Sequence, residues 1–97
     1  MQRTPLTPEE IDDALGSLPG WRLEDDQLKK TFELENFRAA VSFIVRLAFH
    51  AEELDHHPDL HNVYNTVDIA LTTHDAGDRV TEMDVKLAHA IEDFTWV

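Results

Sequence analysis

The spacing of hydrophobic residues changes several times along this chain, and each change marks a predicted element. Thr7–Glu10 indicates a helix start, because threonine can cap, proline suits the first helical position and the second glutamate completes a capping box. Apolar residues at helical spacing follow until Gly16. They then alternate over residues 21–23 and 28–34, on either side of an acidic turn. This second pattern predicts a β-hairpin.

The longest predicted helix opens at Asn36, which can cap it, and ends near Asp55-His56-His57. The end is set by Pro58, because the residue before a proline is biased away from helical geometry. Apolar residues at helical spacing predict one broad buried face. That face comprises Phe37, Ala40, Val41, Ile44, Val45, Ala48, Ala51 and Leu54.

Two strand-like segments follow at residues 60–64 and 67–72, and periodicity leaves open whether Asn65–Thr66 is a tight turn or part of one long strand. A loop over residues 74–80 leads to a last helix that opens at Thr81–Asp84. The order α-β-β-α-β-β-α predicts the α+β class, with an antiparallel sheet and the helices on one face. The inner face of the last helix is predicted as Val85, Leu87, Ala88, Ile91 and Phe94.

Composition and charge narrow the classes of function. A length of 97 residues predicts a single domain over 1–97. The chain has no cysteine, no long apolar run and no apolar N-terminal stretch, so we expect no disulfide, no membrane span and a cytoplasmic location. Eight Lys and Arg against twenty Asp and Glu give a net charge of −12, which disfavours nucleic acid and anionic membranes as partners. A small molecule or another protein is expected instead.

The candidate chemistry lies in the histidines, of which the chain has six. His56 and His57 stand at the predicted helix–strand junction, and His74 stands at the end of the last strand. If the two strand segments are neighbours, His74 can approach that junction. With Glu52 and Asp84 nearby, the three imidazoles predict an acid–base site, because histidine gives and takes protons near neutrality.

The same residues allow other interpretations. A histidine at a helix end is often only a cap or a surface residue. His57 and His61 have the i, i+4 spacing of helical metal ligands, but Pro58 interrupts that helix, and we expect no metal. Neither Ser17 nor Ser42 stands in the glycine-flanked turn of a nucleophile.

The spacing of these residues resembles the signature of pterin-4a-carbinolamine dehydratases. It runs from Glu52 through His56-His57-Pro58 to Tyr64, His74 and a later Asp84, and the likeness extends to Gly20-Trp21 and Asn36-Phe37. The resemblance implies a four-stranded antiparallel sheet with helices on one face and a hairpin turn at Asn65–Thr66. It also implies removal of water from 4a-hydroxytetrahydropterin to give quinonoid dihydropterin, during recycling of the pterin used by aromatic amino acid hydroxylases.

The resemblance further implies that no metal or cofactor is needed and that the chain forms homodimers or homotetramers. Because an animal member is also a dimerisation partner of a homeodomain transcription factor, the alternative function is a protein-binding module on the same fold. One departure concerns the loop from Asp75 to Met83, which is one residue longer than in the animal members and could shift Asp84. Two further departures are substitutions in the pattern. Glu53 stands where many family members have a basic residue, and Leu60-His61 stands where they often have an aromatic pair.

Carried over residue by residue, the family pattern assigns roles to the site. His57 and His74 would be proton donor and acceptor, in either order, and His56 would assist them or orient the substrate. Glu52 and Asp84 would hold imidazole tautomers and raise their basicity. The residues implied to bind the pterin are Asp55, His56, His57, Thr72, Thr73, His74 and Asp75.

Overall fold

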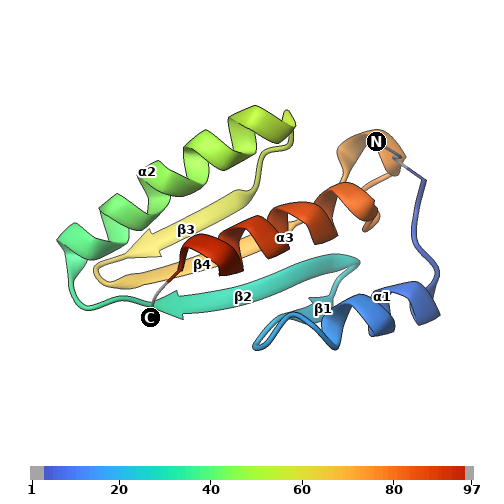
Figure 1. Ribbon diagram of the computed structural model, residues 1–97, viewed down its shortest axis with the longest axis horizontal. Coiled ribbons are helices and arrows are strands. Elements are labelled where there is room, and N and C mark those ends of the chain that lie inside the picture. Colours follow the sequence, from blue (N-terminus) through green and yellow to red (C-terminus); the bar gives the residue numbers. More distant parts are fainter. Residues whose placement is uncertain (1–3, 96–97) are drawn as a thin grey trace.

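Four antiparallel strands form one sheet with the order β1-β2-β4-β3 in the computed structural model, which describes residues 4–95. Figure 1 shows α3 lying across the sheet between α2, on the β3 side, and α1, on the β1 side. The predicted order and the α+β class are confirmed. The elements are α1 (Pro8–Leu15), β1 (Arg22–Glu24), β2 (Gln27–Glu33), α2 (Phe37–Leu54), β3 (Asp59–Val63), β4 (Thr66–Leu71), the short 3-10 helix η1 (His74–Ala76) and α3 (Glu82–Phe94).

The three predicted helix starts are confirmed by their capping contacts. The Thr7 hydroxyl accepts the backbone N–H of Glu10 at 3.2 Å, and the Glu10 carboxylate accepts the Thr7 N–H at 2.9 Å. The side chain of Asn36 accepts a backbone N–H of the first turn of α2. Thr81 and Asp84 form a second capping box at α3. Each contact satisfies a backbone donor that the helix itself leaves free.

Both hairpins turn over two residues. Asp25 and Asp26 have φ values of 54° and 57°, the left-handed pair that matches the twist of the flanking strands β1 and β2. The second turn is Tyr64–Asn65, because Val63 pairs with Thr66. The expected hairpin between β3 and β4 is therefore confirmed, with its turn one residue earlier than Asn65–Thr66.

One face of the sheet makes the core and the other is polar. Along β2 and β4 the buried residues alternate with exposed or half-buried ones, as expected for a sheet covered by helices on one side. The buried sheet residues are Leu28, Phe32, Val67, Ile69 and Leu71, and the helices contribute Ile11, Ala40, Phe43, Leu47, Leu87, Ala88 and Ile91. In α3 the predicted Val85 and Phe94 are partly buried against this core.

The predicted buried face of α2 is wrong in half of its members. Ala40 and Ala51 are buried as expected, but the helix buries Phe43 and Leu47 beside them. Ile44 and Leu54 are partly buried. The predicted residues Phe37, Val41, Val45 and Ala48 lie in solvent instead. Apolar residues surround most of this helix, so their period cannot tell which stripe faces the sheet.

No helix within residues 4–95 is long and apolar enough to cross a membrane.

A pair of leucines tests the core assignment. Leu28 and Leu23 are directly opposed between β2 and β1, yet Leu28 is fully buried and Leu23 is 42% exposed. Leu28→Ala should lower the free energy of unfolding by about 2–5 kcal/mol, the usual range for a truncated core leucine. Leu23→Ala should lower it by less than about 1 kcal/mol. Chemical denaturation measures both, and equal losses would contradict the assigned difference in burial between the two leucines.

Candidate active site

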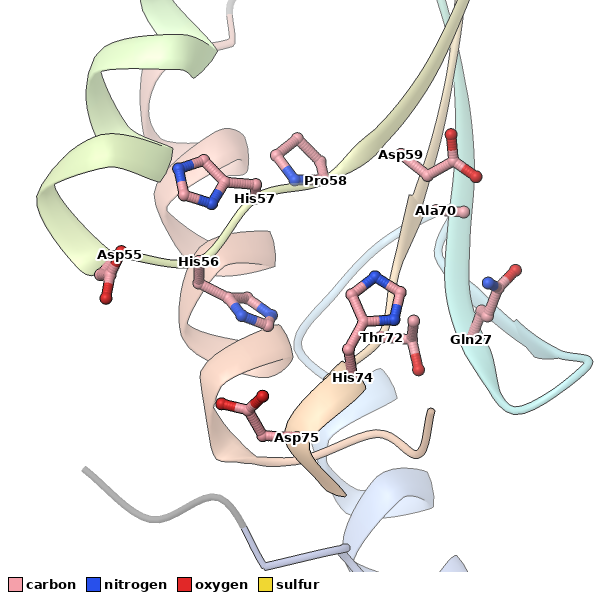
Figure 2. Close-up of a pocket in the computed structure, with 10 residues that line it drawn as sticks. All are labelled: Gln27, Asp55, His56, His57, Pro58, Asp59, Ala70, Thr72, His74 and Asp75. Atoms are coloured by element: carbon pink, nitrogen blue, oxygen red, sulfur yellow. The ribbon is translucent and has the colours of Figure 1, made fainter. Parts of the chain in front are cut away.

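An open pocket of about 530 Å³ lies at one end of the sheet. Figure 2 shows His56 and His57 on the segment between α2 and β3 and His74 on the segment after β4, with the His57 ring turned toward α2. Pairing of β3 with β4 brings these two segments together, as expected from the sequence. The lining residues are Gln27, Asp55, His56, His57, Pro58, Asp59, Ala70, Thr72, His74 and Asp75.

The end of α2 sends the two adjacent histidines to different environments. Asp55 caps the helix in the left-handed conformation, with φ 50° and ψ 44°. The His56 N–H still bonds to the Ala51 carbonyl at 3.0 Å, and Pro58 prevents any further helical turn. As a result His56 is only 5% exposed, whereas the His57 side chain is 59% exposed.

His56 is held by a buried polar network. Its Nε2 lies 2.5 Å from Oδ1 of Asp84, which is fully buried. The other oxygen, Oδ2, accepts the Thr73 hydroxyl and the Thr81 backbone N–H, each at 2.8 Å. The Thr73 and Thr81 hydroxyls also bond to each other at 2.7 Å. Because Asp84 stands in the first turn of α3, the helix dipole also stabilises its negative charge.

The other two histidines have exposed carboxylate partners. His57 Nε2 lies 2.9 Å from Oε1 of Glu52, one helical turn back on α2. His74 Nδ1 lies 2.6 Å from Oδ1 of Asp78, and the His74 side chain is 82% exposed. The hydrogen bond to Asp78 and then the negative charge of Asp78 raise the pKa of His74. Loss of hydration opposes this rise, and the charges of Asp75 and Asp84 add smaller increases.

The carboxylate partners select the imidazole tautomers. An ionised carboxylate only accepts hydrogen bonds, so each bonded ring nitrogen must carry a proton. In the neutral imidazole, this leaves Nδ1 of His56, Nδ1 of His57 and Nε2 of His74 as proton acceptors. Two exposed imidazoles thus offer one free nitrogen each in the same pocket, an arrangement suited to moving protons on a small molecule.

The predicted site residues fall into two groups, those that line the pocket and those that lie outside its lining. Asp55, Thr72 and Asp75 line the pocket together with the three histidines. Glu52 and Asp84 do not line it but contact His57 and His56. Thr73, expected to bind substrate, does not line the pocket. It is fully buried, and its hydroxyl bonds to Asp84 and Thr81.

Sequence reasoning missed Gln27, Pro58, Asp59 and Ala70 in the lining, and Asp78 beside His74. Asp59 and Ala70 are paired across β3 and β4, so the predicted hairpin contained a signal for them. Asp78 follows His74 at an i, i+4 spacing. Gln27 enters through the long-range pairing of β2 with β4, for which the local pattern holds no signal.

Fold and pocket define an α+β protein with a pocket lined by three histidines. The family model described as pterin 4 alpha carbinolamine dehydratase matches residues 4–94. The chain therefore belongs to the pterin-4a-carbinolamine dehydratase family, and the resemblance seen in the sequence is confirmed.

Individual relatives agree over nearly the full length. The chain is 51% identical to a protein from Opitutus terrae named "Putative pterin-4-alpha-carbinolamine dehydratase", over 97% of both chains. It is 45% identical to a protein of the same name from Streptomyces coelicolor, over 96% of this chain and 92% of the relative. A crystal structure of a transcriptional coactivator/pterin dehydratase from Brucella melitensis matches with a TM-score of 0.88 and 38% identity, covering 93% of this chain and 97% of that chain.

The buried carboxylate of Asp84 should be essential for stability. Its oxygens face the His56 ring nitrogen, the Thr73 hydroxyl and the Thr81 N–H, so the amide NH₂ of Asp84→Asn would oppose a donor. We expect the free energy of unfolding to fall by about 3 kcal/mol. The control Glu82→Gln, exposed in the same helical turn, should change it by less than about 0.5 kcal/mol. Urea denaturation compares the two, and similar stabilities would contradict the network.

Proposed function

We propose that this protein removes water from 4a-hydroxytetrahydropterin, giving quinonoid dihydropterin, by general acid–base catalysis with histidine. The observation that carries the proposal is the convergence of three carboxylate-bonded imidazoles on one pocket. Family membership and the names of the relatives support the same reaction. The family resemblance implies that neither a metal nor a cofactor takes part.

The reaction needs two proton transfers. The C4a–O bond breaks as the N5 lone pair forms the C4a=N5 double bond, the leaving hydroxyl takes a proton to become water, and N5 gives up its own proton. One acid and one base that titrate near neutrality suffice for these steps. His57 and His74 fit the two roles, in either order, because both are exposed and each has a free ring nitrogen.

The remaining residues would orient rather than react. His56, nearly buried on Asp84, would fix the position of the substrate or assist the transfer. Glu52 would hold the tautomer of His57. The carboxylates of Asp55 and Asp75 line the pocket and can accept the amino and N–H donors on the edge of a pterin ring, with Thr72 beside them. Thr73 would act only through Asp84.

Replacement of the exposed imidazoles tests the proposal. His57→Ala and His74→Ala should each slow dehydration about 100-fold or more, the usual effect of losing a general acid or base. The control is His61→Ala, because His61 is an exposed histidine on β3 outside the pocket lining. A stopped assay on enzymatically generated 4a-hydroxytetrahydropterin measures all three. Normal rates in both pocket variants would contradict the assignment.

We further propose that the chain self-associates as a homodimer or homotetramer. Phe37, Val41, Val45 and Phe49 form an exposed apolar stripe along α2, which we call the α2 stripe. β3 is an edge strand of the sheet, with unpaired backbone groups along its outer side. One self-complementary surface makes a dimer and two make a tetramer. We also expect the protein to act in the cytoplasm. We expect an aromatic amino acid hydroxylase to supply its substrate.

The α2 stripe can be tested by placing a charge in it. Val45→Glu should lower the mass of the native protein, measured by light scattering after size exclusion, because a buried unpaired carboxylate opposes association. The control Lys86→Glu, exposed on α3, makes the chain more acidic than Val45→Glu does. Loss of mass only in Val45→Glu is expected. An unchanged mass would exclude self-association through α2 and favour the alternative, a stripe that receives a different protein.

A further inference from the structure

We propose that Asp78 is a positioning residue for His74, because its carboxylate holds the imidazole and determines which ring nitrogen can react with the substrate. The inference rests on the proposed function, in which His74 transfers a proton. Asp78 lies in the loop between η1 and α3, and its carboxylate oxygen is 2.6 Å from Nδ1 of His74. The remaining ring nitrogen, Nε2, is then the one available to a substrate.

The backbone holds Asp78 in place for this contact. The 3-10 helix η1 ends at Ala76 and is capped by Gly77. Gly77 and Asp78 both adopt left-handed conformations, with φ values of 74° and 58°. The Asp78 N–H bonds back to the carbonyl of the buried Thr73 at 3.1 Å, and the Thr73 N–H bonds to the Arg79 carbonyl at 3.0 Å. The turn therefore returns the chain to the base of the pocket and places a carboxylate beside the ring.

Aspartate is suited to this position for two reasons. It tolerates the left-handed region better than most residues, because its short polar side chain can bond locally. Its carboxylate also accepts the Nδ1–H of the neutral ring and stabilises the imidazolium when the ring is protonated. Asparagine would keep the backbone conformation and an acceptor oxygen but would lose the charge.

The charges around His74 come from several elements. Asp75 is the next residue of η1, and Asp84 stands at the start of α3. Across the pocket lie Asp55, His56 and His57 from the α2–β3 junction, and Asp59 from β3. On the outer side of the turn, Nε of Arg79 is 3.8 Å from the carboxylate of Asp26.

The sign of the electrostatic effect follows from these charges. The pKa of His74 is raised, chiefly by Asp78, so the ring keeps its proton to higher pH than an isolated histidine. Removing the Asp78 charge must therefore lower the pH at which His74 titrates. The limb of the pH–rate profile that His74 controls must move to lower pH as well, whether His74 acts as the acid or as the base.

A purely structural role would act differently. His74 and Asp78 are both largely exposed, and exposed ion pairs contribute little to folding stability. We therefore expect Asp78→Asn to leave the unfolding transition nearly unchanged while it alters the titration of His74. Asp26→Asn is the matched control, because Asp26 is also an exposed aspartate with a positive φ and its carboxylate faces the same turn through Arg79.

The experiment combines NMR titration of the histidine ring nitrogens with pH–rate profiles of wild type, Asp78→Asn, Asp78→Gly and Asp26→Asn. In Asp78→Asn we expect His74 to titrate at lower pH, the rate limb to move the same way and kcat to fall about two- to fivefold, in keeping with the strength of an exposed pair. Asp78→Gly, which also lacks the acceptor, should in addition lose the fixed Nδ1–H tautomer. In Asp26→Asn, His74 should titrate as it does in wild type.

Unchanged titration of His74 in Asp78→Asn, or a rate limb that stays in place while the titration moves, would overturn the proposal. An equal shift in Asp26→Asn would overturn it as well, because any carboxylate near the turn would then suffice. Failure of the proposed function is distinguishable from these results. In that case wild type itself would not accelerate dehydration, whereas the NMR titration would still report the contact between Asp78 and His74.

Discussion

The buried carboxylate of Asp84 is the interaction on which the rest of the site depends. It joins the start of α3, through the Thr81 N–H, to the segment after β4, through Thr73, and to the α2–β3 junction, through His56. His56 lies 28 residues before Asp84 in the sequence, so the network joins the two segments that carry the pocket histidines. A charge without solvent is stable only when its oxygens are bonded, so the network fixes the relative position of the segments. One capping residue thereby serves both helix formation and the geometry of the pocket.

The three imidazoles share a bonding scheme but differ in burial. Each is bonded to one carboxylate, yet His56 is nearly inaccessible, whereas His57 and His74 face solvent. In the proposed reaction the two exposed rings can exchange protons with water between turnovers, whereas the buried ring keeps its orientation. This difference in burial arises at Asp55, because its left-handed backbone conformation turns the two adjacent histidines toward different surroundings.

The sequence could predict what local chemistry decides. The helix caps are contacts that span only a few residues, and they are made by Thr7, Asn36 and Thr81. Pro58 limits α2 for a steric reason. Because these effects are local, the sequence predicts the helix boundaries. The sequence does not predict the buried face of α2. Val45 and Leu47 are both strongly apolar, and only packing on the sheet decides that Leu47 is buried and Val45 exposed. Thr73 illustrates the same limit at the site. Its neighbour Thr72 lines the pocket, whereas Thr73 is buried and bonds to Asp84 of α3, a contact that the local pattern does not indicate.

The most direct test is the rate at which 4a-hydroxytetrahydropterin, generated by a hydroxylase in the same vessel, loses water with and without catalytic amounts of the wild-type protein. A double variant, His57→Ala with His74→Ala, serves as the reference protein. The account predicts a large acceleration by wild type and none above the spontaneous rate by the double variant. A wild-type rate equal to the spontaneous rate would contradict acid–base catalysis in this pocket, and an equal acceleration by both proteins would contradict the role of the two exposed histidines.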